Sequence, residues 1–577
     1  MNLVVLSWLG VACGVHRPPE ATERADPLTE VRGFAATVAD RGATLPASDP
    51  WDPTPTHVRY LDQGWGPVET LWYYYADQGS RLVRRDVLMH LEAADGQGPF
   101  VSDATFTRFR FLTQARTPNN PDGLPVGVTR DGAYVGLTCA ACHTGQIVYG
   151  DAAIRVDGAP ALIDLIGFID ALEASVRATL SNPDRLARFV AAVDAASADD
   201  QAAARLELER ALAFLDSYSA NFEQVAGGFG RIDAIGGIIA QVVRDTSGSG
   251  HAPPANAPAS YPLLWDAPRH DYVQWAGFSS NAGPGSLARN VGEVVGVFGE
   301  VHVTAAHDAR ENKAGFDTSV QARALVDMEE VLWRLQSPVW PEDLLPPIDR
   351  AKAERGAALY QERCVSCHAV LDRDDPKRRV TAQIVGLDKV GTDPRTALNL
   401  VEAVAPAGVL EGSLTPEGTG FYRREASALE LLGGLVAGTL KRDPVAVLRA
   451  VTNGRLWGIA SSPKQGDHAA DSEADPVASL RAYKARPLNG AWASAPYLHN
   501  GSVPTLYDLL LPEDQRPARF AVGRREYDPE KVGFRYDGDA PWVLDTAIPG
   551  NRNTGHRYGT DLTEADRLAL LEHLKTL

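Results

Sequence analysis

The sequence predicts a mainly α protein built from two similar modules, with long loops and little β structure. The chain has 577 residues, more than one ordinary domain. A five-residue motif, Cys-x-x-Cys-His, occurs twice, at residues 139–143 and 364–368. Hydrophobic residues recur at helical spacing in several segments outside the motifs, and 52 glycines with 39 prolines indicate long connecting loops.

The repeated motif is the attachment signal for c-type haem, so each module is expected to be a cytochrome c-like haem domain. Two thiols one helical turn apart can add to the two vinyl groups of a porphyrin, and the adjacent imidazole can bind the iron. A zinc ribbon would place its cysteine pairs roughly 15–20 residues apart, and a redox dithiol does not need the histidine. We therefore expect two covalent haem c groups, whose attachment residues are Cys139, Cys142, His143, Cys364, Cys367 and His368.

A proline-rich segment separates the two expected haem domains. Four prolines lie within residues 338–347, a composition typical of a linker. We expect a signal or lipoprotein leader at 1–20, an N-terminal haem domain with large insertions at 21–340, and a C-terminal cytochrome c-like haem domain at 341–577.

Each domain has a predicted order of elements. In the C-terminal domain a helix at 355–363 runs into the second motif, and a final helix begins at the N-cap Thr563, with Asp566 at its third position. The N-terminal domain is expected to contain an extended segment at 14–60, a short β-like stretch at 144–147, an amphipathic helix after Pro160, one or two helices at 183–224 and a helix at 320–335.

The N-terminus and the charge indicate the compartment and the partners. Residues 3–12 are apolar but too short to span a bilayer, as is every other apolar run. Cys13 follows a sequence close to a lipoprotein cleavage box, so the protein is expected to be periplasmic or secreted, with or without a lipid on Cys13. A net charge of −18 argues against nucleic acid as a partner.

The sixth ligand of each haem iron decides its chemistry, because two protein ligands favour electron transfer and an open position favours binding of oxygen or peroxide. Methionine is scarce: apart from Met1 there are only Met89 and Met328. This scarcity favours a second haem with two histidine ligands. His499 and His556 lie in unusual surroundings, and either could be the sixth ligand.

An aromatic cluster marks the loop-rich region at 245–300. Its members are either core residues or the lining of an apolar pocket beside the first haem. They are Tyr261, Trp265, Trp275 and Phe278.

Several segments resemble the dihaem rubber oxygenases, relatives of the bacterial dihaem cytochrome c peroxidases. The resemblance extends over most of residues 60–577. The segments are PYLHNGSVPTL at 496–506, YKARPLNGAW at 483–492, GLTCAACHTGQ at 136–146, NNPDGLP at 119–125 and VGTDP at 390–394.

The resemblance implies roles for individual residues. His143 would be the proximal ligand of the reactive, oxygen-binding haem. His368 and His556 would be the two ligands of the second haem. An aromatic residue would line the oxygen pocket, for which Trp265, Trp275 and Phe278 are the candidates.

Two enzyme activities and one non-enzymatic role are compatible with these features. The favoured hypothesis is a dioxygenase that cleaves carbon–carbon double bonds of a polyisoprene-like hydrocarbon with O2 at the first haem. The alternative is a dihaem peroxidase that reduces H2O2 with electrons from a small redox protein, relayed through the second haem. A pure electron-transfer protein would not need a chain of this length.

Overall fold

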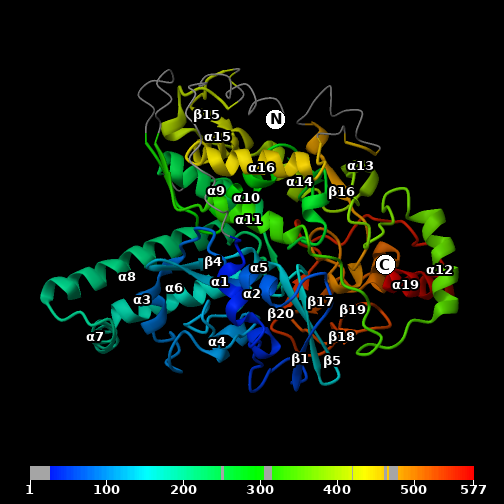
Figure 1. Ribbon diagram of the computed structural model, residues 1–577, viewed down its shortest axis with the longest axis horizontal. Helices are drawn as coiled ribbons and strands as arrows, with labels where there is room; N and C mark the ends of the chain where they lie inside the picture. The colour runs from blue at the N-terminus through cyan, green and yellow to red at the C-terminus, as the bar shows by residue number, and fades with distance from the viewer. Residues whose placement is uncertain are drawn as a thin grey trace.

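Helices and short strands alternate along the chain (Figure 1). The computed structural model describes residues 26–248, 252–304, 315–416, 418, 420–460, 464–466 and 478–577; the expected leader at 1–20 and Cys13 lie outside them. Of the described residues, 40% are helical and 16% are in strands. The fold is therefore mixed α/β, and the expected mainly α fold of two cytochrome c-like domains with little β structure is wrong.

The elements of the described residues have the following bounds. The helices are α1 Thr29–Ala35, α2 Pro67–Tyr75, α3 Arg85–His90, α4 Asp103–Arg108, α5 Cys139–Cys142, α6 Leu165–Ser181, α7 Pro183–Ala192, α8 Ala198–Ser219, α9 Ala234–Ser247, α10 Gly285–Gly296, α11 Ala322–Leu332, α12 Arg350–Arg363, α13 Leu387–Val390, α14 Arg395–Glu402, α15 Ala428–Leu440, α16 Pro444–Leu456, α18 Leu506–Leu509 and α19 Glu564–Thr576. The strands are β1 His57–Tyr60, β2 Val83–Arg84, β3 Val128–Asp131, β4 Tyr134–Leu137, β5 Thr144–Tyr149, β6 Ala152–Asp157, β7 Arg231–Ile232, β8 Ala259–Ser260, β9 Tyr272–Val273, β10 Ser279–Ser280, β11 Val301–Val303, β12 Phe316–Thr318, β13 Gln383–Gly386, β14 Val404–Pro406, β15 Glu425–Ser427, β16 Ala482–Ala485, β17 Arg519–Val522, β18 Tyr527–Asp528, β19 Gly533–Phe534 and β20 Trp542–Asp545.

The β structure comes mostly from segments that the sequence predicts as loops. In the described residues the strands form two three-stranded and seven two-stranded sheets. Some partners are distant in sequence: β1 runs parallel to β6, and β13 is antiparallel to β16. Backbone N–H and C=O groups that leave water must be paired, and short ladders pair them. Partners so far apart leave no local periodicity by which to predict them.

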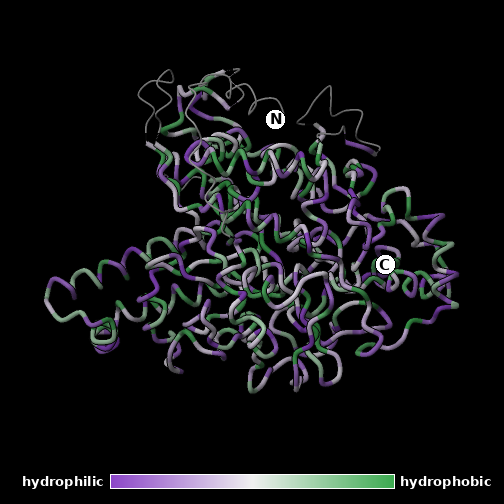
Figure 2. Tube along the Cα trace, viewed as in Figure 1, coloured by the Kyte–Doolittle hydropathy of each residue, from purple (hydrophilic) through white to green (hydrophobic). Residues whose placement is uncertain are grey.

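The predicted helices of the N-terminal half are present, with shifted ends. The segment 183–224 forms α7 and α8, and the segment 320–335 contains α11. The helix expected after Pro160 begins later, at α6, because the Asp164 side chain accepts a hydrogen bond from Gly167 N and caps it there. Helices α6, α7 and α8 together project from one side of the molecule (Figure 1). Hydrophobic and hydrophilic residues alternate along α8 (Figure 2).

Two hydrophobic clusters contain residues from both sides of the expected domain boundary at 340/341. The boundary itself stays a prediction. Helices α9, α10 and α11 pack against α15 and α16, in the upper part of Figure 1. Trp340, inside the proline-rich segment, is buried and packs on Trp492 and Tyr527 in a core that also contains Tyr73 of α2. The two halves of the chain thus share their interior.

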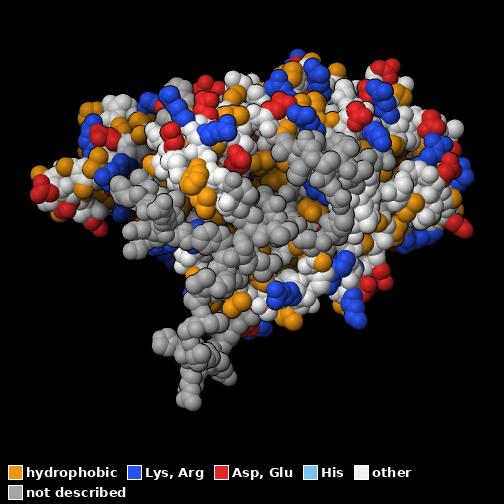
Figure 3. All heavy atoms as spheres, turned by 90° about the horizontal axis from the view of Figure 1, so that it is seen from above, with side chains coloured by type: hydrophobic (Ala, Val, Ile, Leu, Met, Phe, Trp, Pro, Cys, Tyr) orange, Lys and Arg blue, Asp and Glu red, His pale blue; other side chains and the backbone are white. Residues whose placement is uncertain are grey.

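The surface gives no sign of a membrane span or a large basic patch. None of the helices in the described part of the chain has the length and apolar character needed to cross a membrane. On the face drawn in Figure 3, the described basic and acidic side chains are interspersed.

Helices α12 and α19 cross at a glycine, and both begin as the sequence predicts within a few residues. The Thr563 hydroxyl accepts a hydrogen bond from Asp566 N at the start of α19, which confirms the predicted cap. At Gly356 of α12, an added Cβ would lie 2.0 Å from the carbonyl oxygen of Ala569. Only glycine allows this close approach, which brings α12 and the second motif against the C-terminal helix.

We predict that Gly356→Ala destabilises the protein. The added methyl group must push α12 and α19 apart, at a cost of about 1–3 kcal/mol, which outweighs the gain of up to about 1 kcal/mol in helix propensity. The midpoint of chemical denaturation should fall, whereas Ala358→Ser, at an exposed position of α12, should change it little. An unchanged or higher midpoint in Gly356→Ala would contradict the close approach.

Candidate functional site

The first motif forms a single helical turn between two strands. Strand β4 leads into α5, where Thr138 Oγ1 accepts a hydrogen bond from Ala140 N and donates one to Tyr74 O. The turn carries Cys139 and Cys142, which are not joined in a disulfide. Two thiols on one turn, followed at once by a histidine, is the arrangement that covalent haem attachment needs.

His143 is held in one orientation by two hydrogen bonds. Its Nδ1 lies 2.7 Å from the carbonyl oxygen of Pro262. Because a carbonyl oxygen only accepts, Nδ1 carries the hydrogen and Nε2 keeps its lone pair. The Tyr73 hydroxyl, from α2, donates to the backbone oxygen of His143 at 2.7 Å. Burial lowers the pKa of His143 to about 4, so the ring is the neutral form that binds iron.

Helix α2 is itself anchored by a buried carboxylate. Asp157 accepts hydrogen bonds from Trp65 Nε1 at 3.0 Å, Thr70 Oγ1 at 3.0 Å and Tyr74 OH at 2.7 Å. The next residue, Gly158, donates its N–H to the backbone oxygen of His143. The carboxylate thus ties α2 to the strand that follows the motif and keeps Tyr73 in place.

The second motif repeats this construction. His368 Nδ1 lies 2.6 Å from the carbonyl oxygen of Arg486, so Nε2 again keeps its lone pair. The Tyr360 hydroxyl, from α12, donates to the backbone oxygen of His368 at 2.7 Å. Each motif therefore has a tyrosine from the preceding long helix and a backbone carbonyl from a much later segment. Both rings present Nε2 as a metal ligand requires.

The thiols are in environments that suit thioether formation better than metal binding. Burial raises the pKa of Cys139 and of Cys142 to about 12, and that of Cys364 to about 11. Zinc binds the thiolate, which burial disfavours. No three His, Cys, Asp or Glu side chains in the described residues lie together as a metal site. The residues present fit covalent haem.

His556 lies opposite His368. The two ring centroids are 6.3 Å apart, with the ring planes at 53°. Two metal–imidazole bonds of about 2 Å on opposite sides of one iron place the ring centroids roughly 6 Å apart. His556 Nδ1 is buried without a hydrogen-bond partner among the described residues, and burial lowers the pKa of His556 to about 3. A neutral, unpartnered ring at this spacing fits an iron ligand.

The loop before α19 fixes His556 in place. Its backbone is left-handed, with φ 48°, and its N–H donates to Val390 O at 2.7 Å. At Gly555 an added Cβ would lie 2.2 Å from the backbone of Gly391. The VGTDP segment and the loop before α19 therefore meet in direct backbone contact.

His499 occupies a different place. Its ring stacks on Tyr483, with centroids 4.1 Å apart, and contacts Trp275 edge-on at 6.5 Å. It is buried, which lowers its pKa to about 4, and its Nε2 has no partner in the described residues. No ring contact joins it to either motif histidine in the described residues. Of the two histidines left open by the sequence, the geometry favours His556 as the ligand, which stays a prediction.

The predicted aromatic residues separate into two places. Trp275 and Phe278 are half-buried and pack in one cluster with Tyr483. Trp265 is 1% exposed, lies in the main core, and donates its indole N–H to Asn489 O at 2.9 Å. Trp265 is thus enclosed by the core, whereas Trp275 and Phe278 are partly accessible. The pocket-lining role of all three stays a prediction.

A polar group beside Cys139 was not predicted. On α10, Arg289 pairs with Glu329 of α11, and Glu293 accepts a hydrogen bond from Gln274 Nε2 at 2.5 Å. The charges of Glu293, Glu329 and Arg289 all act on the Cys139 thiol. Burial raises the pKa of Glu293, although 39% of its side chain is accessible. The i, i+4 spacing of Arg289 and Glu293 in a mostly apolar helix is the sequence feature that could have predicted this polar group.

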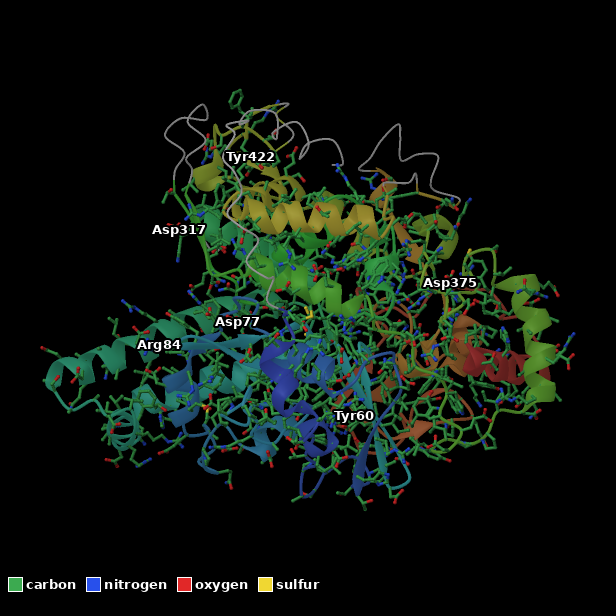
Figure 4. The ribbon with its side chains drawn as sticks, in the orientation of Figure 1. Tyr60, Asp77, Arg84, Asp317, Asp375 and Tyr422 are labelled. Carbon is green, nitrogen blue, oxygen red and sulfur yellow. The ribbon has the colours of Figure 1, made fainter. Side chains whose placement is uncertain are left out.

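A hollow in the surface lies at the end of α2. It has a volume of about 550 Å³ and is lined in part by Trp72, Tyr75 and Asp77, the last labelled in Figure 4. The next residue, Gln78, is buried, and its Oε1 lies 3.4 Å from Cys139 Sγ. Gln78 therefore lies next to both the lining of the hollow and the first attachment site.

Comparison with known proteins agrees with this geometry. A family described as RoxA-like, cytochrome c-like matches residues 482–521, the segment that carries the carbonyl of Arg486 and the ring of His499. An uncharacterized protein of Sinorhizobium fredii, y4iJ, is 32% identical over 597 aligned residues, covering 90% of this chain and 93% of the relative. A second uncharacterized protein of that organism, y4iM, is 30% identical over 214 residues, 36% of this chain and 38% of the relative. The chain therefore belongs to the family of y4iJ and, through its RoxA-like cytochrome c region, is a haem c oxidoreductase.

Proposed function

We propose that the chain binds two covalent haem c groups and that the haem at Cys139 and Cys142 is the reactive one. The observation that carries this proposal is a difference between the two motif histidines. Their rings are held in the same way, but different groups face them. His368 has a second histidine, His556, opposite its ring, whereas the only ring contact of His143 within the described residues is with Tyr261. An iron with two histidine ligands transfers electrons, and an iron with one can bind a small molecule.

The preferred reaction is oxidative cleavage of a carbon–carbon double bond by O2. Haem iron supplies the oxygen-binding chemistry. Both oxygen atoms end in the product, one in each of two carbonyl groups, so no external reductant is consumed. Trp275 and Phe278 would hold an apolar chain by the burial of hydrocarbon surface, and positioning of the double bond accounts for much of such catalysis. The resemblance to the rubber oxygenases supports a polyisoprene-like hydrocarbon as the substrate.

Peroxide reduction is the second candidate, because of Glu293. Reduction of H2O2 to two waters consumes two electrons and two protons, so a peroxidase needs a residue that delivers protons. Glu293 beside Cys139, with Gln274 bonded to it and its pKa raised by burial, is suited to that role. The electrons would come from a small redox protein through the haem at His368.

The location of the protein follows from the same proposal. Covalent haem attachment takes place outside the cytoplasm in bacteria, so a periplasmic or secreted protein is proposed. The acidic net charge of −18 gives no attraction to nucleic acid.

Labelled oxygen separates the two reactions. Incubation of the purified protein with polyisoprene under ¹⁸O2, without peroxide, should give aldehyde and ketone ends that each carry one labelled oxygen, measured by mass spectrometry with rapid trapping of the carbonyls. Unlabelled products, together with strong peroxide-dependent oxidation of a small donor, would contradict the dioxygenase and support the peroxidase.

The substitution Glu293→Gln provides an independent test of whether the protein is a dioxygenase or a peroxidase. For a dioxygenase that needs no proton delivery, cleavage should stay within a few-fold of the unmodified protein. For a peroxidase, loss of a general acid–base group should lower turnover by about 100-fold or more. Glu354→Gln, at an exposed position of α12, is the matched control and should have no effect in either assay.

His556→Ala should convert one low-spin ferric signal to a high-spin signal in electron paramagnetic resonance, because it removes the second ligand from the iron at His368. His499→Ala is the control, since its ring stacks on Tyr483 and faces neither motif histidine. If His499→Ala causes the conversion and His556→Ala does not, the ligand assignment is reversed.

A further inference from the structure

Two cations lie at the end of one strand, close to buried His270 and to the second motif histidine. Lys484 lies on β16 and Arg486 follows its end. Residues two apart on an extended chain point to the same face, so these side chains share a side, opposite to Tyr483. Lys484 Nζ donates to Tyr272 O at 3.1 Å and lies 3.4 Å from His270 Nδ1. Buried His270 has a pKa well below its usual value. Desolvation is the larger cause, and the positive charges of Lys484 and Arg486 lower the pKa further.

The two cations connect the surroundings of the two motifs. Arg486 provides the carbonyl for His368 and its charge acts on that ring. Arg289, whose charge acts on His143 and Cys139, also acts on Lys484 and His270. Buried positive charge therefore runs from the first attachment site to the second.

Two buried carboxylates, Asp271 and Asp266, attract Lys484 and Arg486 respectively, and both have other partners. Asp271 accepts hydrogen bonds from the backbone N–H groups of Tyr272 and Ala382. Within the described residues neither Lys484 nor Arg486 forms an ion pair, and Arg486 Nε is buried without an acceptor. Asp266 is the carboxylate that attracts Arg486, but it already pairs with Arg378 Nε at 2.6 Å and lies 3.6 Å from Arg269 Nε. Arg378 Nη2 and Arg269 Nε are also buried without a hydrogen-bond acceptor.

Burial without an anion is costly for a cation. It lowers the pKa of Lys484 to about 7 and that of Arg486 to about 10, in each case chiefly through desolvation. A group with carboxylates, placed beside these side chains, would remove this cost and satisfy the unpaired N–H donors. Haem carries two propionate carboxylates, and the proposed haem at His368 would lie close to Arg486, whose carbonyl oxygen contacts that histidine.

We propose that Lys484 and Arg486 bind haem propionates, with Arg486 serving the haem held at His368. This inference rests on the proposed pair of haem groups. The negative charge of the propionates stabilises the ferric iron, and salt bridges to Lys484 and Arg486 would offset that charge. The two side chains therefore hold the reduction potential of the second haem high, as charge near a haem does in general.

Redox titration of the purified holoprotein tests the proposal. The midpoint potential of the second haem is followed by the loss of its low-spin ferric signal on reduction. Arg486→Gln and Lys484→Gln should each lower this potential, and Arg486→Lys, which keeps the charge, should recover most of the shift. Arg481→Gln is the control: it removes a cation just before β16, but Arg481 is exposed and pairs only at 4.0 Å with Glu402.

Haem content separates the possible failures. Each variant keeps the four cysteines, so its intact mass should equal that of the unmodified protein apart from the substitution. Unchanged potentials in both glutamine variants, at full haem content, would overturn the propionate assignment while leaving the proposed function intact. An unmodified protein with fewer than two haem groups would instead overturn the proposed function. If Arg486→Gln does not fold, Lys484→Gln alone decides.

Discussion

The hydrogen bond from a histidine Nδ1 to a backbone carbonyl is the constraint on which the rest of the site depends. It selects the tautomer and fixes the ring, so that Nε2 of His143 and of His368 is available as a ligand. Both carbonyls belong to segments far from their motifs in sequence, and those segments are bonded to each other. Trp265, three residues after Pro262, donates its indole N–H to Asn489, three residues after Arg486. A displacement at one histidine would thus be transmitted to the carbonyl of the other.

In the proposed function, the same local construction leads to different chemistry because of what lies opposite each ring. The loop before α19 brings His556 to face His368, and backbone contact between Gly555 and Gly391 leaves that loop little freedom. The charges of Glu293, Glu329 and Arg289 act instead on Cys139. In the proposed arrangement a second imidazole closes one site, whereas the other has two carboxyl groups and an arginine near its cysteine. This combination is what leaves oxygen and peroxide as competing oxidants in the proposed function.

Local sequence signals predicted local structure well and long-range structure poorly. The two Cys-x-x-Cys-His motifs, the cap at Thr563 and the helices α7, α8 and α11 follow from neighbouring residues. The expected mainly α fold was wrong because ladders such as β1 with β6 join segments that no local pattern relates. The partners of His143 and His368 are backbone carbonyls, which have no sequence signature. Glu293 was missed for a related reason, since its charge acts on Cys139 only in the folded chain. The core encloses Trp265, which the sequence offers either as a core residue or as one of three candidates for the pocket.

The most direct test of the account is the intact mass of the purified protein under denaturing conditions, where only covalent groups remain attached. Two independent attachment sites predict a mass that exceeds the processed polypeptide by two haem units, falling by one unit when Cys139 and Cys142 are both replaced by alanine and by one when Cys364 and Cys367 are. A gain of one haem unit or none in the unmodified protein would contradict the claim that the two motifs are equivalent attachment sites.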